Sequence, residues 1–149
     1  MKRWSTVAAR WIAAFAAGGC TAAALQAADP EPLALRAIME ALGGHMEAAA
    51  GAIAREDWAG VAKIAPLIAA HPQPPALEKA RILAFIGADA GRFRGHDEQV
   101  HAAAGDLGRA AARADAPAVI GAFAELQLRC HGCHAEFRRP FTRHFYEGR

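Results

Sequence analysis

The chain has 149 residues, of which 54% are hydrophobic but only 7% aromatic. Its 17 basic and 15 acidic residues give a formal net charge of +2. A balance this close to zero excludes the broad basic surface that nucleic-acid binding needs.

The N-terminus has the pattern of a secretory signal peptide. "MKRWSTVAAR" contains three basic residues and no acid, and the uncharged stretch "WIAAFAAGGCTAAAL" follows it. That apolar run is about fifteen residues long, whereas a membrane-spanning helix needs about twenty. We therefore predict a signal peptide over residues 1–27, cleavage after Ala27 and an exported, periplasmic protein without a membrane span. A retained anchor and a lipidated Cys20 are the alternatives.

Removal of the signal peptide changes the charge of the working protein. It takes away three of the 17 basic residues and none of the 15 acidic ones, which leaves a formal charge of about −1. No nucleic-acid partner is expected for such a chain. Residues 28–149 are enough for one domain with a single core.

Helices are predicted along nearly all of this domain, in chain order. In the first helix, the larger apolar residues recur at intervals of three, four and seven, which places them on one stripe. Asp57 is the expected N-cap of the second helix, and the three prolines of "HPQPPA" predict a loop at 71–76. The predicted helices cover residues 31–57, 57–70, 77–87, 89–115 and 116–139, and the last is expected to end near Pro140.

This succession of amphipathic helices predicts the fold class. Four of the helices are long enough to pack side by side, and their connections are short. No segment alternates between polar and apolar residues as a strand would. The prediction is an all-α protein, an antiparallel four-helix bundle.

The last long helix contains "CHGCH", with Cys130, Cys133 and His134. Residues three or four positions apart in a helix lie on the same side, here the apolar one. Two thiols on that side can add to the two vinyl groups of a haem while the neighbouring imidazole reaches its iron. The C-x-x-C-H order is the attachment signature of c-type haem. We therefore predict one covalently bound haem c, with iron, on the C-terminal helix.

Three other uses of two cysteines fit less well. A tetrahedral zinc site wants a second pair of ligands, and none is evident. A redox dithiol belongs at a helix N-terminus beside a strand, but this motif lies near a helix C-terminus. A simple disulfide leaves His134 unexplained.

The layout resembles that of the class II c-type cytochromes, the cytochrome c-prime family. "CHGCHAEFRR" is similar to that family's C-x-x-C-H-x-x-F/Y-R ending, and "LRAIMEALGGHM" is similar to its first helix. The resemblance covers roughly residues 31–139. It implies that Arg138 lies near the proximal face of the haem, and that a homodimer through the first two helices is an assembly to consider.

The resemblance also places Met39 at the position opposite His134. In one branch of the family, methionine there is the sixth ligand, the haem is low-spin and the protein carries electrons. In the five-coordinate branch an apolar side chain shields a site open to nitric oxide or carbon monoxide. We favour the methionine-ligated branch, with Met39 as the ligand. The alternatives are that Met46 ligates the iron instead, or that Met39 only packs in the core.

The expected function is therefore single-electron transfer between redox partner proteins. A gas-binding haem protein and a haem-bearing subunit of an oxidoreductase are the alternatives. No catalytic constellation stands out, so the chain is not expected to be an enzyme. Arginines are in excess over acids from residue 129 onward, which suggests either a basic rim that steers an acidic redox partner or a solvated helix end.

Overall fold

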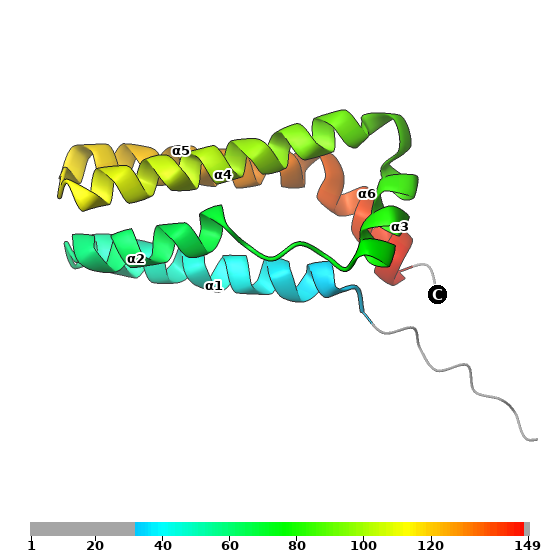
Figure 1. Cartoon of the computed structure of the whole chain (residues 1–149), viewed down its shortest axis with the longest axis horizontal. Coiled ribbons are helices and arrows are strands. Elements are labelled where there is room, and N and C mark those ends of the chain that lie inside the picture. The colour runs from blue at the N-terminus through cyan, green and yellow to red at the C-terminus, as the bar shows by residue number, and fades with distance from the viewer. Residues whose placement is uncertain (1–31, 148–149) are drawn as a thin grey trace, which may run out of the picture. The chain divides into compact units, whose positions relative to one another are not determined.

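The computed structural model describes residues 32–147 and consists there of helices joined by short connections (Figure 1). The predicted signal peptide, its cleavage point and Cys20 lie outside the described residues. No helix in the described range is long and apolar enough to cross a membrane. The described part contains no strand, which confirms the all-α prediction.

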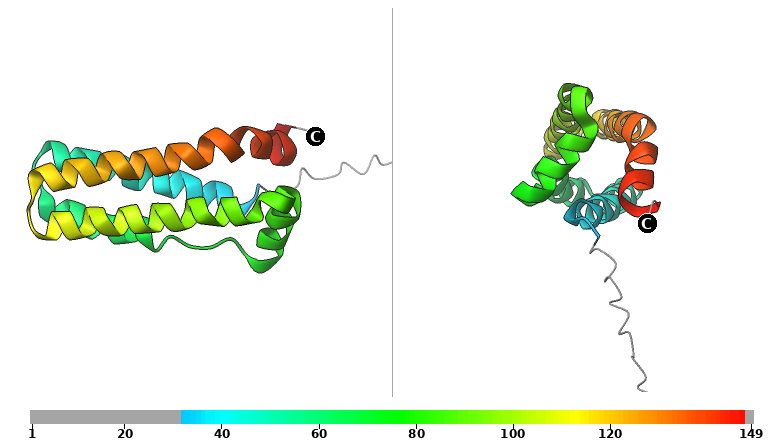
Figure 2. Two further views of the ribbon diagram at one scale, coloured as in Figure 1. Left: turned by 90° about the horizontal axis from the view of Figure 1, so that it is seen from above. Right: turned by 90° about the vertical axis from the view of Figure 1, so that its right-hand side faces the viewer.

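Four long helices form the bundle. The right-hand view of Figure 2 looks along them and shows the four around a shared interior. Neighbours in the bundle run antiparallel, with α2 packed between α1 and α4, and with α4 packed along α5. The predicted four-helix bundle is therefore confirmed. Its members are α1 (Ala34–Ala54), α2 (Trp58–Ala69), α4 (Ala90–Ala112) and α5 (Ala116–Cys133).

The two turns at one end of the bundle, α1–α2 and α4–α5, are built alike. Each contains a non-glycine residue in the left-handed region, Glu56 with φ of 55° and Ala114 with φ of 52°. An aspartate follows and caps the next helix. The Asp57 carboxylate accepts from the Gly60 amide at 2.8 Å, and the Asp115 carboxylate from the Ala118 amide at 3.2 Å. The N-cap predicted at Asp57 is confirmed, and this chemistry stops and restarts the helices sharply.

The core lies toward this turn end. Its largest fully buried side chains are Val61 and Ile68 of α2, Leu107 of α4, and Val119 and Leu126 of α5. Small residues let the helices approach closely: a Cβ added at Gly108 would lie 3.3 Å from the Cβ of Ala65. Every residue that is buried as a whole in the described part of the chain is apolar, so apolar packing fills this core.

The short helix α3 (Ala76–Ile86) and the C-terminal segment close the opposite end (Figure 1). A short 3₁₀ turn, Gly87–Asp89, joins α3 to α4. Because α1 begins without a side-chain cap of its own, its first amides need another partner. The Glu78 carboxylate of α3 supplies it, accepting from the amides of Ala34 at 2.7 Å and Leu35 at 2.8 Å.

The chain does not leave the helical path near Pro140, so that predicted end is wrong. After α5 it continues through a π-helical turn, His134–Arg138, then α6 (Arg139–Thr142) and a second π-helical turn, Arg143–Glu147. Pro140 sits in the first turn of α6, where the fixed φ of proline suits a helix. Phe141 and Phe145 are buried against Leu33 and Ile82, which anchors the tail.

Candidate haem site

The two cysteines of the attachment motif lie in the last turn of α5. Cys130 and Cys133 are both half-buried, and their thiols are not joined to each other. Cys130 also packs against the main hydrophobic core. Two unbonded thiols on the same side of one helix end are the arrangement that two thioether links to a single flat group require.

The surroundings of these thiols disfavour two of the alternative chemistries. Burial raises the pKa of Cys130. Burial, followed by the negative charge of Asp97, Cys130 and Glu136, raises the pKa of Cys133 to about 11. A redox dithiol needs a lowered pKa, so this environment opposes that role. A zinc site fares no better, because the one cluster of metal-ligating side chains found in residues 32–147 contains neither cysteine.

His134 begins the π-helical turn that follows α5 and is exposed. Partial loss of hydration, and then the positive charges of Arg138 and His131, lower its pKa. A lowered pKa keeps the imidazole neutral, and neutral imidazole is the form that coordinates iron. Single π-helical turns often occur at functional sites because they re-aim the side chains that follow.

Side chains of α4 hold this turn in place. The Glu136 carboxylate pairs with Arg92 at 2.8 Å and with the His96 ring nitrogen at 3.1 Å. Phe137 is buried and meets the ring of Phe93 edge-on, with centroids 5.3 Å apart. These contacts fix the helix one turn beyond the cysteines, so they position the segment that carries His134.

The two methionines of α1 differ in their surroundings. Met46 is half-buried and packs against the main core, whereas Met39 is 41% exposed. Ligation of the iron by Met39 stays a prediction, and its side chain is more open than that of Met46 although the two lie on one face of α1. The reason is that α1 makes only slight contact with α5, so its first half has no partner helix to bury it.

The remaining predicted site residue, Arg138, is exposed. Arg36, the other arginine near this end, pairs with Glu40 at 3.1 Å and lies over the ring of Tyr146 at 5.7 Å. The structure therefore brings Cys130, Cys133 and His134 together on one helix end. Met39 belongs to a different helix, α1.

Burial along the helices tests whether these residues fit a haem. Among the described residues, none is buried in 34–48 of α1, 90–102 of α4 or 127–136 around the motif. All three stretches belong to the end of the bundle away from the α1–α2 and α4–α5 turns (Figure 1). A large flat apolar group tethered at Cys130 and Cys133 would cover such half-open apolar surfaces, so the residues present fit the group.

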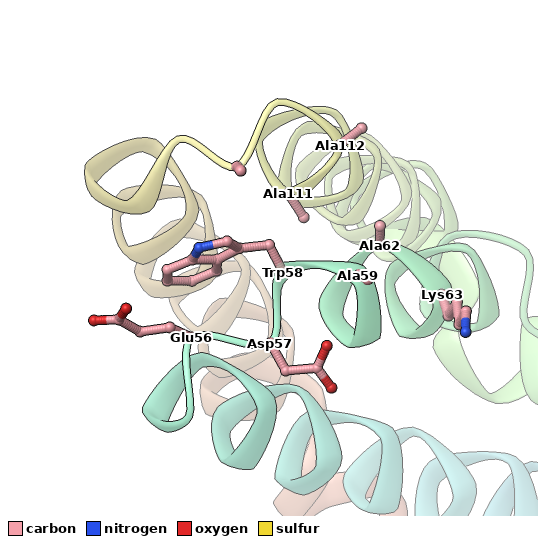
Figure 3. A pocket seen from close by; sticks show the side chains of 9 residues that line it. Glu56, Asp57, Trp58, Ala59, Ala62, Lys63, Ala111 and Ala112 are labelled. Carbon is pink, nitrogen blue, oxygen red and sulfur yellow. The ribbon is translucent and has the colours of Figure 1, made fainter.

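A pocket at the other end of the bundle is a different feature. It lies beside the α1–α2 and α4–α5 turns, and Figure 3 shows Trp58 across its middle with Glu56 and Asp57 pointing apart. The length of α5, about 27 Å at 1.5 Å per residue, separates this pocket from the attachment motif. It contributes nothing to the haem site.

Sequence reasoning missed three polar residues near the motif. His71, Asp97 and His101 form a compact cluster, and Asp97 contributes to the raised pKa of Cys133. The i, i+4 spacing of Asp97 and His101 was a visible sign that they share one face of a helix. His71 had no such sign, because only the fold brings the loop after α2 against α4.

Comparison with known proteins settles the family. A family model described as Cytochrome C′ matches residues 31–138. Searches of curated proteins and of solved structures gave no match. The matched range spans the four-helix bundle and the whole attachment motif. The chain therefore belongs to the cytochrome c′ family of class II c-type cytochromes, which carry covalently attached haem c.

Proposed function

We propose that this protein is a monohaem electron carrier in which Cys130 and Cys133 hold the haem and His134 and Met39 are the axial ligands of its iron. The observation that carries the proposal is the contrast between the methionines. Met46 already packs against the core, whereas Met39, on the same face of α1, is 41% exposed and available to a ligand.

Each residue has a distinct part in this proposal. The bound haem supplies a site that accepts and releases one electron. Two thioether links at Cys130 and Cys133 would keep the group from dissociating. Glu136, held by Arg92 and His96, steadies the turn that carries the imidazole of His134. A Met39 thioether would favour the reduced iron and exclude gases, and Arg138 would lie beside the proximal face.

A five-coordinate, gas-binding protein is the second candidate, and one observation favours it. Met39 belongs to neither hydrophobic cluster of the described residues, so packing does not hold its side chain in one place. An unheld thioether is a weaker ligand, because ordering it costs side-chain entropy. Nitric oxide or carbon monoxide would then find the distal side open.

The absorption spectrum of the purified holoprotein separates the two candidates. If Met39 ligates the iron, the ferric protein is low-spin with a weak far-red sulfur charge-transfer band, and the ferrous form binds carbon monoxide slowly. Met39→Ala should make the iron high-spin and open to the gas. Met46→Ala is the matched control and should leave the spectrum nearly unchanged. A wild-type spectrum that is already high-spin, with rapid carbon monoxide binding, would contradict methionine ligation and favour gas binding.

We also propose that the protein works after export, as the N-terminal pattern "MKRWSTVAAR" followed by an apolar run suggests. The intact mass of the mature protein tests this proposal. A chain that begins at Ala28 and carries one haem is expected. A chain retaining residues 1–27 would contradict export by cleavage, and a lipidated chain beginning at Cys20 would replace the periplasmic location with a lipid anchor.

The redox partner is proposed to be acidic where it meets the attachment end. Arg138, Arg139 and Arg143 are all exposed there, whereas Arg129 is paired with Glu125 and is therefore partly neutralised. Exposed charges of one sign speed the encounter with a partner of the other sign, and salt screens that effect. The rate of electron transfer with the physiological partner should fall as salt rises, and a flat or rising rate would remove the steering claim.

A further inference from the structure

His71, Asp97 and His101 form a compact group that shares no residue with the attachment motif. His71 follows the last turn of α2, and Asp97 and His101 lie one turn apart on α4. The three side chains offer ligand atoms that all lie within 4.8 Å of one another. The two imidazole rings also lie close together, with centroids 4.8 Å apart and planes tilted at 51°.

The hydrogen bonds of His71 leave an unmatched pair of acceptors. Its Nδ1 lies 3.0 Å from the carbonyl oxygen of Pro72, and a carbonyl can only accept, so Nδ1 must carry the proton. The Nε2 of a neutral ring is then an acceptor, yet it lies 3.2 Å from a carboxylate oxygen of Asp97. Two acceptors at that distance repel unless a second proton on the ring or a metal ion lies between them.

His101 also has a ring nitrogen without a hydrogen-bond partner, beside the second oxygen of the Asp97 carboxylate. Its Nε2 is buried and has no hydrogen-bond partner, although it lies 3.4 Å from the second oxygen of Asp97. A buried polar atom without a partner is uncommon and calls for an explanation. The side chain of His71 is only 6% exposed, whereas those of Asp97 and His101 are 42% and 33% exposed, so the cluster is open to solvent on the α4 side alone.

We propose that His71, Asp97 and His101 bind a divalent transition-metal ion of the zinc type, separate from the haem iron. Two imidazoles and one carboxylate suit Zn²⁺, Cu²⁺ or Ni²⁺ better than Mg²⁺ or Ca²⁺, which prefer oxygen ligands. The Pro72 carbonyl, by fixing the proton on Nδ1, directs the lone pair of His71 Nε2 at the ion. Zinc ligands lie about 3.3 Å apart in a tetrahedron, so the cluster needs only a small closure, with water as the fourth ligand.

The test is a calorimetric titration of the chelator-treated, haem-loaded protein with ZnCl₂. One ion per chain is expected. His71→Gln should weaken binding by at least about tenfold, because a ligand is lost. Asp97→Asn keeps the shape of the side chain and should weaken binding similarly, which covers the case in which His71→Gln does not fold. His45→Gln on α1 is the matched control and should bind as the wild type does, and MgCl₂ should give no comparable heat.

Two outcomes would overturn the proposal. The first is the absence of saturable zinc binding, which would mean that protons alone satisfy the cluster, or equal binding by wild type and Asp97→Asn, which would place the zinc elsewhere. The second is a changed axial-ligand spectrum of the haem in His71→Gln or His101→Gln, which would assign these rings to the iron instead. Unchanged haem bands together with lost zinc binding would support a separate site.

Discussion

The two ends of the bundle differ in how their interiors are filled. At the turn end, Val61, Leu107 and Val119 are fully buried, and Trp58 packs against them. At the motif end, the cysteines are half-buried, Met39 is 41% exposed and the neighbouring stretches of α1, α4 and α5 contain no buried residue. The turn end is thus a protein core complete in itself, whereas the motif end has the apolar surfaces of a core that a bound group completes.

The difference shows how one helix can have two tasks. The apolar stripe of α5 continues at the same helical spacing from Val119 and Leu126 to Cys130 and Cys133. The first half of the stripe is buried where α5 packs along α4, which in turn approaches α2 closely at Gly108. Its second half faces the first half of α1 across a slight contact. The stability of the bundle therefore depends mainly on the turn end, which leaves the motif end available to bind the cofactor.

The largest effect should come from removing both thioether positions. The double variant Cys130→Ala, Cys133→Ala should carry no covalent haem after acid-acetone extraction, as mass spectrometry would show. Hydrogen exchange should then speed up in residues 34–48 and 127–136, while the region around Leu107 keeps most of its protection. Equal loss of protection at both ends would contradict the claim that the turn end has a core complete without haem. A variant that retains covalent haem would refute the attachment sites.

A smaller effect distinguishes the two sides of α5 within the complete core. Leu126→Ala removes a side chain with no exposure and should lower the free energy of unfolding by about 3 kcal/mol. Leu128→Ala, on the same helix but 62% exposed, should change it by less than about 0.5 kcal/mol. Chemical denaturation of the two holoproteins measures both values. Similar losses would mean that the exposed face of α5 is covered in solution.

The smallest effect concerns the cap that α3 provides at the motif end. Glu78→Ala leaves the first amides of α1 without their carboxylate and should cost about 1–2 kcal/mol. Glu47→Ala, an exposed glutamate in the middle of α1, is the control and should be nearly neutral. If the control loses as much, the cap does not account for the loss; if neither variant loses stability, α1 does not depend on α3 for its start.

Local sequence rules predicted the parts of this fold that local chemistry determines. The helices follow the periodicity of their apolar residues, and Asp57 and the proline loop mark boundaries as expected. The continuation past Pro140 escaped prediction because a proline in the first turn of a new helix looks the same in sequence as one that ends a helix. The burial of Phe141 and Phe145 depends on distant partners, Leu33 and Ile82, which no local pattern identifies.

The candidate site also combines residues that are placed by local sequence with residues that are placed by tertiary packing. Cys130, Cys133 and His134 are neighbours in sequence, so a helix alone brings them together. The exposure of Met39 depends on how little α1 touches α5, and the support from Arg92 and His96 depends on how α4 packs. The cluster of His71, Asp97 and His101 needs the loop after α2 to meet α4. Interactions of that kind are set by tertiary packing, which the spacing of residues within one helix does not report.

The packing of Phe145 against Leu33 has a consequence for the order of folding. The two residues are 112 positions apart, so their contact closes nearly the whole domain into one loop. Closing a loop of that length costs about 4 kcal/mol of chain entropy before any contact compensates for it. During synthesis the contact also has to wait until Phe145 has been made. The helices at the turn end can pair earlier through short connections, so we expect the motif end to be the last part to consolidate.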